Sequence, residues 1–249
     1  MSDVLHELPD GQSTAAAYGA LADCYGEAGE FGEAEVFYRR ALVVDPAAVG
    51  LHVRLARTLL GLNRPDEAEG HLRRALTLEQ GSSVAACAYA ELCLAQGRLA
   101  DAARILRGAF EAGPTPETHA AYAELAWSIG ALADAERHYG EALRDPEARP
   151  EVRASLGLVL ISRRRTADAE PHLRAAADAL GCAASLTNHA NALAELGRAD
   201  EAMSRYRAAL AADDECAEAQ WGIAQLTGDD EARARALAGR QPVEPRPPR

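Results

Sequence analysis

Histidine, cysteine and carboxylate side chains are the groups in this sequence that could bind a metal or act as nucleophiles and bases. No two histidines lie four residues apart, which is the spacing of a helical zinc-protease pair. The cysteines form no C-x-x-C pair, and the G-x-S-x-G turn, the phosphate-binding glycine loop and the dinucleotide-binding fingerprint are all missing. Carboxylates are abundant, but they recur at a regular spacing that indicates a structural use. We therefore predict that the chain is not an enzyme and holds no cofactor or metal.

The charge balance argues against nucleic acid as a partner, and the distribution of apolar residues argues against a membrane. The formal net charge is −12 and the pI is near 5.1, whereas nucleic-acid-binding proteins normally carry a basic face. All 26 basic residues are arginine, a bias typical of GC-rich bacterial coding sequences. No apolar stretch reaches 18 residues, and Met1 to Gln12 has no apolar signal-peptide core. We expect a bacterial cytoplasmic protein without a disulfide framework, since its five cysteines are an odd number.

A short acidic–alanine pair repeats six times along the chain. Its alanine recurs at intervals of 34, 34, 33, 34 and 33 residues, at Ala34, Ala68, Ala102, Ala135, Ala169 and Ala202. A second alanine follows each of these after seven residues, with a bulky residue between the two. Another small residue stands twelve positions before each first alanine. Such columns of small residues allow neighbouring helices to approach closely, while the bulky residues fill the adjacent grooves.

A turn-forming residue stands five positions before most of these alanines. It is glycine or asparagine, which can adopt the left-handed backbone conformation that ends a helix, at Gly29, Asn63, Gly97, Gly130 and Gly197. Arg164 occupies the same place in the fifth repeat. Each repeat thus predicts a first helix, a turn and a second helix. One such pair cannot bury both apolar faces, so we expect the repeats to stack around a continuous core.

The pattern resembles the tetratricopeptide repeat family. The match is fullest over Tyr18-Gly-Ala-Leu-Ala-Asp-Cys-Tyr25 through Pro46 and over Leu193 through Ala209. The resemblance implies an all-α fold, a right-handed α-solenoid of six helix–turn–helix repeats. We place these at 15–48, 49–82, 83–115, 116–149, 150–182 and 183–215. The fifth repeat is the least regular, because it lacks a glycine turn and carries Pro171 inside its second helix.

The segments outside the repeats differ in composition. Residues 1–14 are predicted to be an N-terminal lead, with Ser13 or Thr14 as the N-cap of the first helix. Residues 216–238 predict C-terminal capping helices, the first containing Trp221 and the second beginning near Asp229. Residues 239–249 contain four prolines and three arginines, so we predict a disordered tail.

Some residues at regular positions allow two interpretations. His189 and Cys93 replace large core residues at inward positions. We interpret both as core residues, with a ligand or redox role as the alternative. The run Arg163-Arg164-Arg165 is interpreted as cations at the C-terminus of a helix, with a docking patch for an acidic partner as the alternative.

The resemblance also implies that the first helices line a concave groove. Trp127 is the first candidate for a binding hot spot there, and the alternative is partial burial against Ile161 and Leu94. Asn188 and Asn191 match asparagines that contact a peptide backbone in sugar-transferase-associated repeats, since an amide both donates and accepts hydrogen bonds.

Charged residues complete this predicted surface. Arg54 and Arg57 lie three residues apart and could hold a partner carboxylate, or instead pair with Asp23 and Glu91. The predicted partner-binding residues are Asp23, Arg54, Arg57, Glu91, Glu124, Trp127, Ile161, Asn188 and Asn191.

We expect a non-catalytic scaffold or adaptor that binds a peptide or a partner protein in the groove. Two alternatives stay open: a structural protein that forms homo-oligomers, and a substrate-presenting or regulatory module of a separate enzyme system. Binding of chaperone C-termini is not expected, because the family's clamp for them uses lysine and this chain has none.

Overall fold

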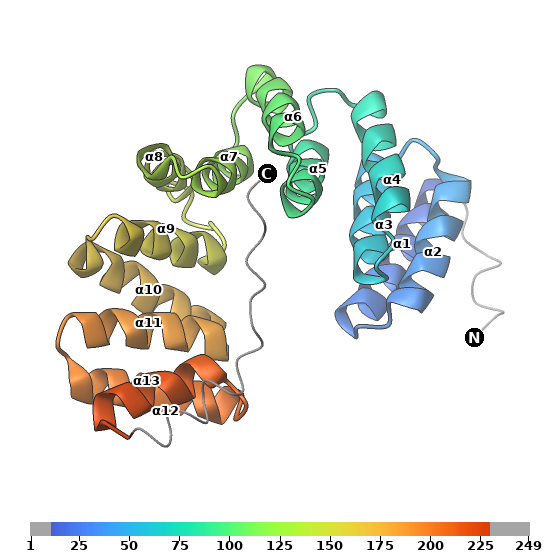
Figure 1. Ribbon diagram of the computed structural model, residues 1–249. Coiled ribbons are helices and arrows are strands. Elements are labelled where there is room, and N and C mark those ends of the chain that lie inside the picture. The colour runs from blue at the N-terminus through green and yellow to red at the C-terminus, as the bar shows by residue number, and fades with distance from the viewer. Residues whose placement is uncertain (1–10, 230–249) are drawn as a thin grey trace. The chain divides into compact units, whose positions relative to one another are not determined.

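The computed structural model describes residues 11–229, and this part of the chain consists of thirteen helices without a strand (Figure 1). The predicted fold class, an all-α helical repeat, is therefore confirmed. The helices fall into two compact units, Met1–Ile129 and Gly130–Arg249. Each unit is described separately below.

In the first unit, each helix packs against the next along the chain. The first helices of successive repeats also pack on one another, α3 on α5 and α5 on α7. The helices are α1 (Gly11–Glu27), α2 (Phe31–Val44), α3 (Val49–Gly61), α4 (Pro65–Leu78), α5 (Ser83–Ala95), α6 (Leu99–Ala112) and α7 (Pro116–Ser128).

The second unit follows the same rule, with sequential helices in contact and α9, α11 and α13 packed in succession. Its described helices are α8 (Leu132–Ala142), α9 (Pro150–Ser162), α10 (Thr166–Leu180), α11 (Ala183–Glu195), α12 (Ala199–Ala212) and α13 (Ala217–Thr227).

The alanine columns lie in the core of each unit. All six alanines of the acidic–alanine pairs have an exposed fraction of 0%. The bulky residue between the two alanines of each repeat is buried as well, at Tyr38, Leu72, Leu106, Tyr139, Leu173 and Tyr206. The approach is also close at Gly157, where an added Cβ would lie 2.6 Å from the side chain of Leu173, and at Gly222, where it would meet the ring of Tyr206. Small residues therefore set how closely the helices can stack.

All six expected turn positions have a left-handed backbone. The φ angle is 78° at Gly29, 58° at Asn63 and 61° at Arg164, and Gly97, Gly130 and Gly197 are similar. At Asn63 and Arg164, the backbone N–H of the following residue donates to the carbonyl oxygen five residues before it and so ends the first helix. These bonds are Arg64 to Leu59 and Arg165 to Leu160, each at 2.9 Å. The sequence pattern thus located the turn even where arginine replaces glycine.

The ends of the described region differ in part from expectation. Helix α1 already begins at Gly11, so Ser13 and Thr14 lie inside it and the prediction that either is its N-cap is wrong. A hydroxyl that can cap a helix can also lie within one, and nothing between Gly11 and Thr14 interrupts helical hydrogen bonding. Helix α13 coincides with the first expected capping helix. The second capping helix and the tail 239–249 lie outside the described residues, and the exact repeat boundaries stay a prediction.

Replacing Ala102 with leucine tests the close packing of the alanine column. The added volume has no space on α6, so we expect a loss of about 1–3 kcal/mol in the free energy of unfolding, measured by urea denaturation. Ala100→Leu on the exposed side of the same helix is the matched control, with an expected change within about 0.5 kcal/mol. Equal effects of the two substitutions would contradict the packing argument.

Replacing Arg164 with glycine tests the strain of the fifth turn. Glycine removes a Cβ clash worth about 1–2 kcal/mol and adds freedom to the unfolded chain, so we expect a net gain of about 0.5–1 kcal/mol in stability. Arg164→Ala removes the same charge but keeps the Cβ, and it should bring no gain. A melting temperature that rises equally in both variants would attribute the effect to charge instead.

Candidate functional site

The predicted partner-binding residues of the first unit share one helical position. Asp23, Arg57, Glu91 and Glu124 lie on α1, α3, α5 and α7 and are separated by one repeat length each. Because the repeats superpose by that length, these side chains project from the same side of successive first helices. We call the surface of Asp23, Arg54, Arg57, Glu91, Glu124 and Trp127 the first-helix face of this unit.

Asp23 is fully engaged within the protein. Its Oδ2 accepts a hydrogen bond from Nη1 of Arg54 at 2.7 Å, and its Oδ1 accepts one from the hydroxyl of Tyr38. Burial and the hydrogen bond to Asp23 raise the pKa of Tyr38 far above its ordinary value, so its hydroxyl remains a donor. Of the two interpretations of Arg54, pairing with Asp23 is thus the one observed within the chain.

Arg57 and Glu91 do not form the expected ion pair. Both are exposed, and neither has an ion-pair partner among the residues that the structure describes. Glu124 is exposed too, whereas the indole of Trp127 is partly buried. The first-helix face therefore presents two uncompensated charges of opposite sign, one repeat apart, beside a partly accessible tryptophan on α7.

In the second unit, Asn191 repeats the arrangement of Asp23. The Tyr206 hydroxyl donates to Oδ1 of Asn191 at 2.6 Å, across the same separation of 15 residues as in the Tyr38–Asp23 pair. The amide nitrogen of Asn191 is left as a donor. Asn188 and Ile161 are both partly buried, and Asn188 makes no hydrogen bond within residues 11–229. The structure thus provides two amide groups on α11 with unused hydrogen-bonding capacity.

A ladder of arginines at the starts of the second helices was not predicted from the sequence. Four of them, Arg64, Arg98, Arg165 and Arg198, stand directly before a second helix and bond an acidic residue three positions ahead. Each also reaches back to an acidic residue on the preceding second helix. The pairs are Arg64–Glu35 at 2.7 Å, Arg98–Glu69 at 2.8 Å, Arg165–Glu136 at 2.7 Å and Arg198–Glu170 at 3.4 Å.

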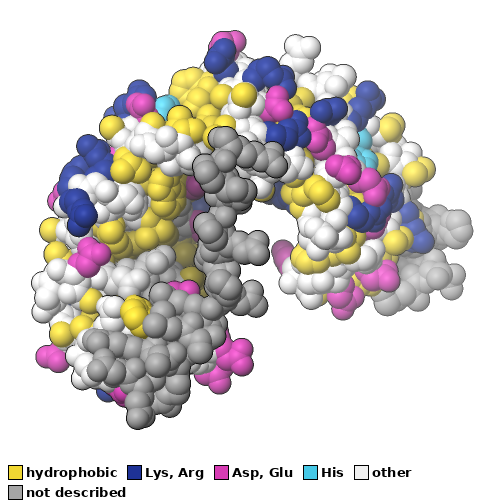
Figure 2. Space-filling model, in the orientation of Figure 1, with side chains coloured by type: hydrophobic (Ala, Val, Ile, Leu, Met, Phe, Trp, Pro, Cys, Tyr) yellow, Lys and Arg dark blue, Asp and Glu magenta, His cyan; other side chains and the backbone are white. Residues whose placement is uncertain are grey.

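The ladder explains much of the charged surface. In Figure 2, arginine and acidic side chains lie interspersed and not in separate fields. Arg163 bonds Glu136 as well, so two members of the arginine run at 163–165 serve the ladder and Arg164 serves the turn. The available sequence signal was an arginine after the turn and an acid about 29 residues before it. This geometry supports the structural interpretation of the arginine run.

Glu69 is the most strongly bonded carboxylate of the ladder. It accepts hydrogen bonds from Arg98, from the hydroxyl of Tyr89 and from Arg73, at 2.6–2.8 Å. The bonds from Arg98 and Tyr89 lower the pKa of Glu69 to about 2. Its charge is therefore retained over the whole physiological range.

His189 takes the place of Tyr89 in the second unit. Its Nε2 lies 3.1 Å from Oε1 of Glu170, which is buried and acts as the acceptor, while the Nδ1 of His189 is buried and has no hydrogen-bond partner within residues 11–229. Cys93 is fully buried in the first unit, and burial raises the pKa of its thiol. Both residues therefore lie in the core, as the first interpretation predicted.

The structure brings two other histidines together. Nδ1 of His52 and Nδ1 of His71 lie 3.0 Å apart, and Nε2 of His52 lies 3.1 Å from the carbonyl oxygen of Pro46. Burial, together with the nearby His52 and Arg39, lowers the pKa of His71. Among the described residues, no group of three or more His, Cys, Asp or Glu side chains is arranged to hold a metal ion. Over the same range, no helix is long and apolar enough to cross a bilayer.

These features define a helical-repeat protein built from stacked pairs of antiparallel helices. Models of the tetratricopeptide repeat match residues 27–86, 65–125 and 187–240, which together exceed half of the chain. The chain belongs to the tetratricopeptide repeat family, whose repeats generally mediate protein–protein interactions. No curated protein matches the sequence significantly.

Solved structures share the fold at low sequence identity. A chain of the APC/C hetero-tetramer Cut9-Hcn1 is 16% identical with a TM-score of 0.77, over 95% of this chain and 45% of that one. PilF of Pseudomonas aeruginosa is 20% identical with a TM-score of 0.67, over 93% and 100% of the two chains. PilW, a type IV pilus biogenesis factor, is 18% identical with a TM-score of 0.66, over 90% and 98%. This chain spans less than half of the first of these, and at such identities the likeness extends to the fold alone.

Replacing Glu69 with glutamine tests the ladder. A largely buried carboxylate with three donors loses its charge, so we expect a cost of about 2 kcal/mol in the free energy of unfolding at pH 7. Because the pKa of Glu69 is lowered in the folded state from 4.5 to about 2, its contribution is complete above pH 4.5 and is lost as the pH falls toward 2. The difference in the free energy of unfolding between the wild type and Glu69→Gln should therefore become smaller in urea denaturations below pH 4.5. Glu91→Gln, at an exposed carboxylate with no ion pair among the described residues, is the control and should show no comparable cost at pH 7.

Proposed function

We propose that this protein is a non-catalytic scaffold or adaptor that binds a peptide or a partner protein on its first-helix faces. The observation that carries the proposal is the pair of exposed, uncompensated charges at Arg57 and Glu91. Charges that the fold needs are paired, as in the arginine ladder. Charges at equivalent positions of neighbouring repeats that have no ion-pair partner among residues 11–229 are suited to complementary charges on another molecule.

The chemistry of the faces favours an extended peptide or a short helix. Opposite charges one repeat apart fix the direction of a ligand, and the partly accessible Trp127 offers an apolar anchor. On α11, the amide of Asn188 and the amide nitrogen of Asn191 make no hydrogen bond within residues 11–229, and they can bond a peptide backbone whatever its side chains are. Only a few residues in each repeat would contact a ligand held in this way.

The proposal includes the setting in which the protein works. Its acidic balance and arginine-only basic residues favour a bacterial cytoplasm, with neither nucleic acid nor a membrane as the partner. Homo-oligomers remain an alternative, and light scattering over a range of concentrations separates the two. A monomer at every concentration excludes assembly through stacked copies.

The test of the proposal starts from a partner captured with the wild-type protein and identified by mass spectrometry. Trp127→Ala, Arg54→Glu and Arg57→Glu should each weaken the affinity for the purified partner, by about tenfold for an anchor residue. Helicity and melting temperature should stay close to those of the wild type, since Arg54 and Arg57 are exposed and surface ion pairs contribute about 0–1 kcal/mol.

Arg74→Glu is the matched control, because Arg74 is exposed on the second helix α4 of the same unit. Its affinity should equal that of the wild type. If the three first-helix variants bind as tightly as the wild type, the first-helix face is not the binding site.

A further inference from the structure

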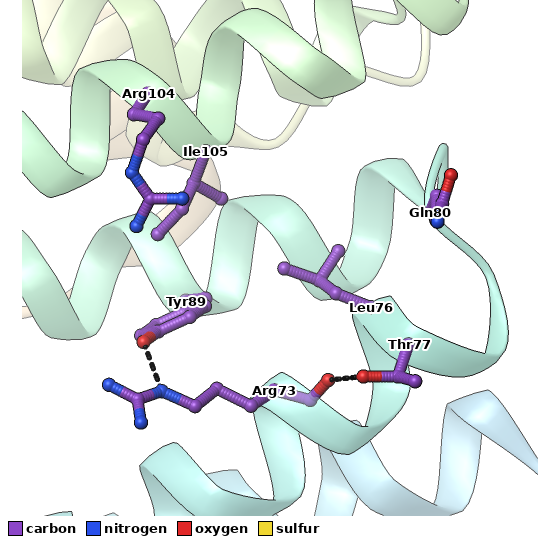
Figure 3. A pocket seen from close by; sticks show the side chains of 7 residues that line it. All are labelled: Arg73, Leu76, Thr77, Gln80, Tyr89, Arg104 and Ile105. Atoms are coloured by element: carbon purple, nitrogen blue, oxygen red, sulfur yellow. Dashed lines mark hydrogen bonds between the residues drawn. The ribbon is translucent and has the colours of Figure 1, made fainter.

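A hollow of about 460 Å³ lies in the first unit, on the side of the second helices. It is lined by Arg73, Leu76, Thr77 and Gln80 from the α4 segment, Tyr89 from α5, and Arg104 and Ile105 from α6 (Figure 3). Tyr89 and Glu91 are two residues apart on α5, about 200° around the helix, so the hollow faces away from the first-helix face. Its volume falls within the range of about 300–1,000 Å³ that is common for ligand pockets.

The hollow combines an apolar floor with a basic rim. The floor is formed by Leu76, Ile105 and the ring of Tyr89, of which Ile105 and Tyr89 are buried. Arg73 and Arg104 form the rim, with 65% and 71% of their side chains exposed. Figure 3 shows the two guanidinium groups on either side of Tyr89. An apolar side chain that enters the hollow would therefore meet a guanidinium group on each side.

The arginines around the hollow outnumber the carboxylates that they bond. Arg73 bonds Glu69, Arg98 bonds both Glu69 and Asp101, and Arg104 contacts Asp101 at 3.4 Å. Three cations thus share two anions, which leaves an excess positive charge on a chain whose net charge is −12. Within the described residues, the long contact to Asp101 is the ion pair of Arg104, so most of its N–H donors are unused.

The preceding and the last pair of repeats lack this arrangement. At the positions equivalent to Arg73 and Arg104, they have Arg39 with Gly70 and Arg174 with Ser204. Neither pair supplies a second guanidinium group. The next pair has arginine at both positions, Arg107 and Arg137, but Glu111 and His138 replace Thr77 and Ile105 there. The local feature is therefore the combination of the two arginines with the apolar Ile105 and the uncharged Thr77.

We infer that this hollow is a second binding site, which takes an acidic side chain next to a leucine-like side chain on a partner protein. The apolar side chain packs on Leu76, Ile105 and Tyr89, while the carboxylate lies between Arg73 and Arg104 and accepts charge-assisted hydrogen bonds from them. The site does not depend on the first-helix faces, and it selects partners by an acidic–apolar pair of residues.

The test uses two tripeptide probes that differ only in charge, acetyl-Leu-Glu-Leu-amide and acetyl-Leu-Gln-Leu-amide. Each is titrated into the ¹⁵N-labelled full-length chain, and the Arg73 and Arg104 side-chain Nε–H signals and the Thr77 amide signal are followed by NMR. The glutamate peptide should shift these signals saturably, less so at high salt, and the glutamine peptide should bind about tenfold more weakly or not at all.

Variants locate the site. Arg104→Gln should weaken binding of the glutamate peptide by about tenfold, while Arg137→Gln should leave it unchanged. Arg137 is the matched control, because it occupies the equivalent position one repeat later, is 64% exposed and pairs with Asp134 in the same way. Thr77→Phe, at an exposed position on the rim, should block binding by filling the hollow without altering any charge.

Three outcomes would overturn the inference: equal binding of the two peptides, the same affinity for Arg104→Gln as for Arg137→Gln, or no saturable shift at millimolar peptide. Arg57→Glu should leave binding of the glutamate peptide intact. An experiment that rules out binding in the hollow is thus distinguishable from one that rules out binding on the first-helix face.

Discussion

The stacking of helices through columns of alanine is the constraint on which the rest of this structure depends. A methyl group at Ala34, Ala68 or Ala102 allows two helices to approach until the bulky residue four positions later fills the groove beside it. The same contact recurs at every repeat, so one rule of packing positions all the helices within a unit. Each first helix is thereby held at the same rotation as its neighbours, and side chains one repeat length apart project from the same side. Both candidate binding surfaces follow from this alignment.

The arginine ladder adds a second, weaker order to the stack. Most of its members are at least one-third exposed, and such pairs contribute little to stability in water. Their geometry is nevertheless specific, because each arginine bonds its own helix and the preceding second helix together. Glu69 and Glu170 differ from the rest, since they are largely buried and receive an additional hydrogen bond from Tyr89 and His189 on the first helices. At these two carboxylates the ladder is therefore hydrogen-bonded to inward-facing side chains of the first helices. Glu170 provides the hydrogen-bond partner that His189 needs at such a position.

The two candidate binding surfaces of the first unit, the first-helix face and the hollow, use different charged residues. Arg57 and Glu91 on the first helices are exposed and have no ion-pair partner in the described part of the chain, whereas Arg73 and Arg104 on the second helices rim an apolar hollow. The solved structures at 16–20% identity share the fold that results from this stacking. The features that would distinguish this protein from other members of its family are therefore side chains that the stacking leaves unconstrained. Arg104 is an example, because its equivalents in the other repeats are Val36, Gly70, Arg137, Pro171 and Ser204.

The sequence by itself determined the helical-repeat fold, the alanine core and the turns, even at Arg164, because small residues and positive φ angles are local requirements that recur in each repeat. It also placed Asp23, Arg57 and Glu91 on one face, since helical geometry alone relates them. Only the tertiary structure decided which charges pair: Arg54 bonds Asp23, whereas Arg57 and Glu91 do not pair with each other, and Tyr206 occupies one side of the Asn191 amide. It alone revealed the hollow beneath Arg73 and Arg104. The physical reason is that a long charged side chain has several partners within reach, and the small energy differences between them depend on how closely the helices pack.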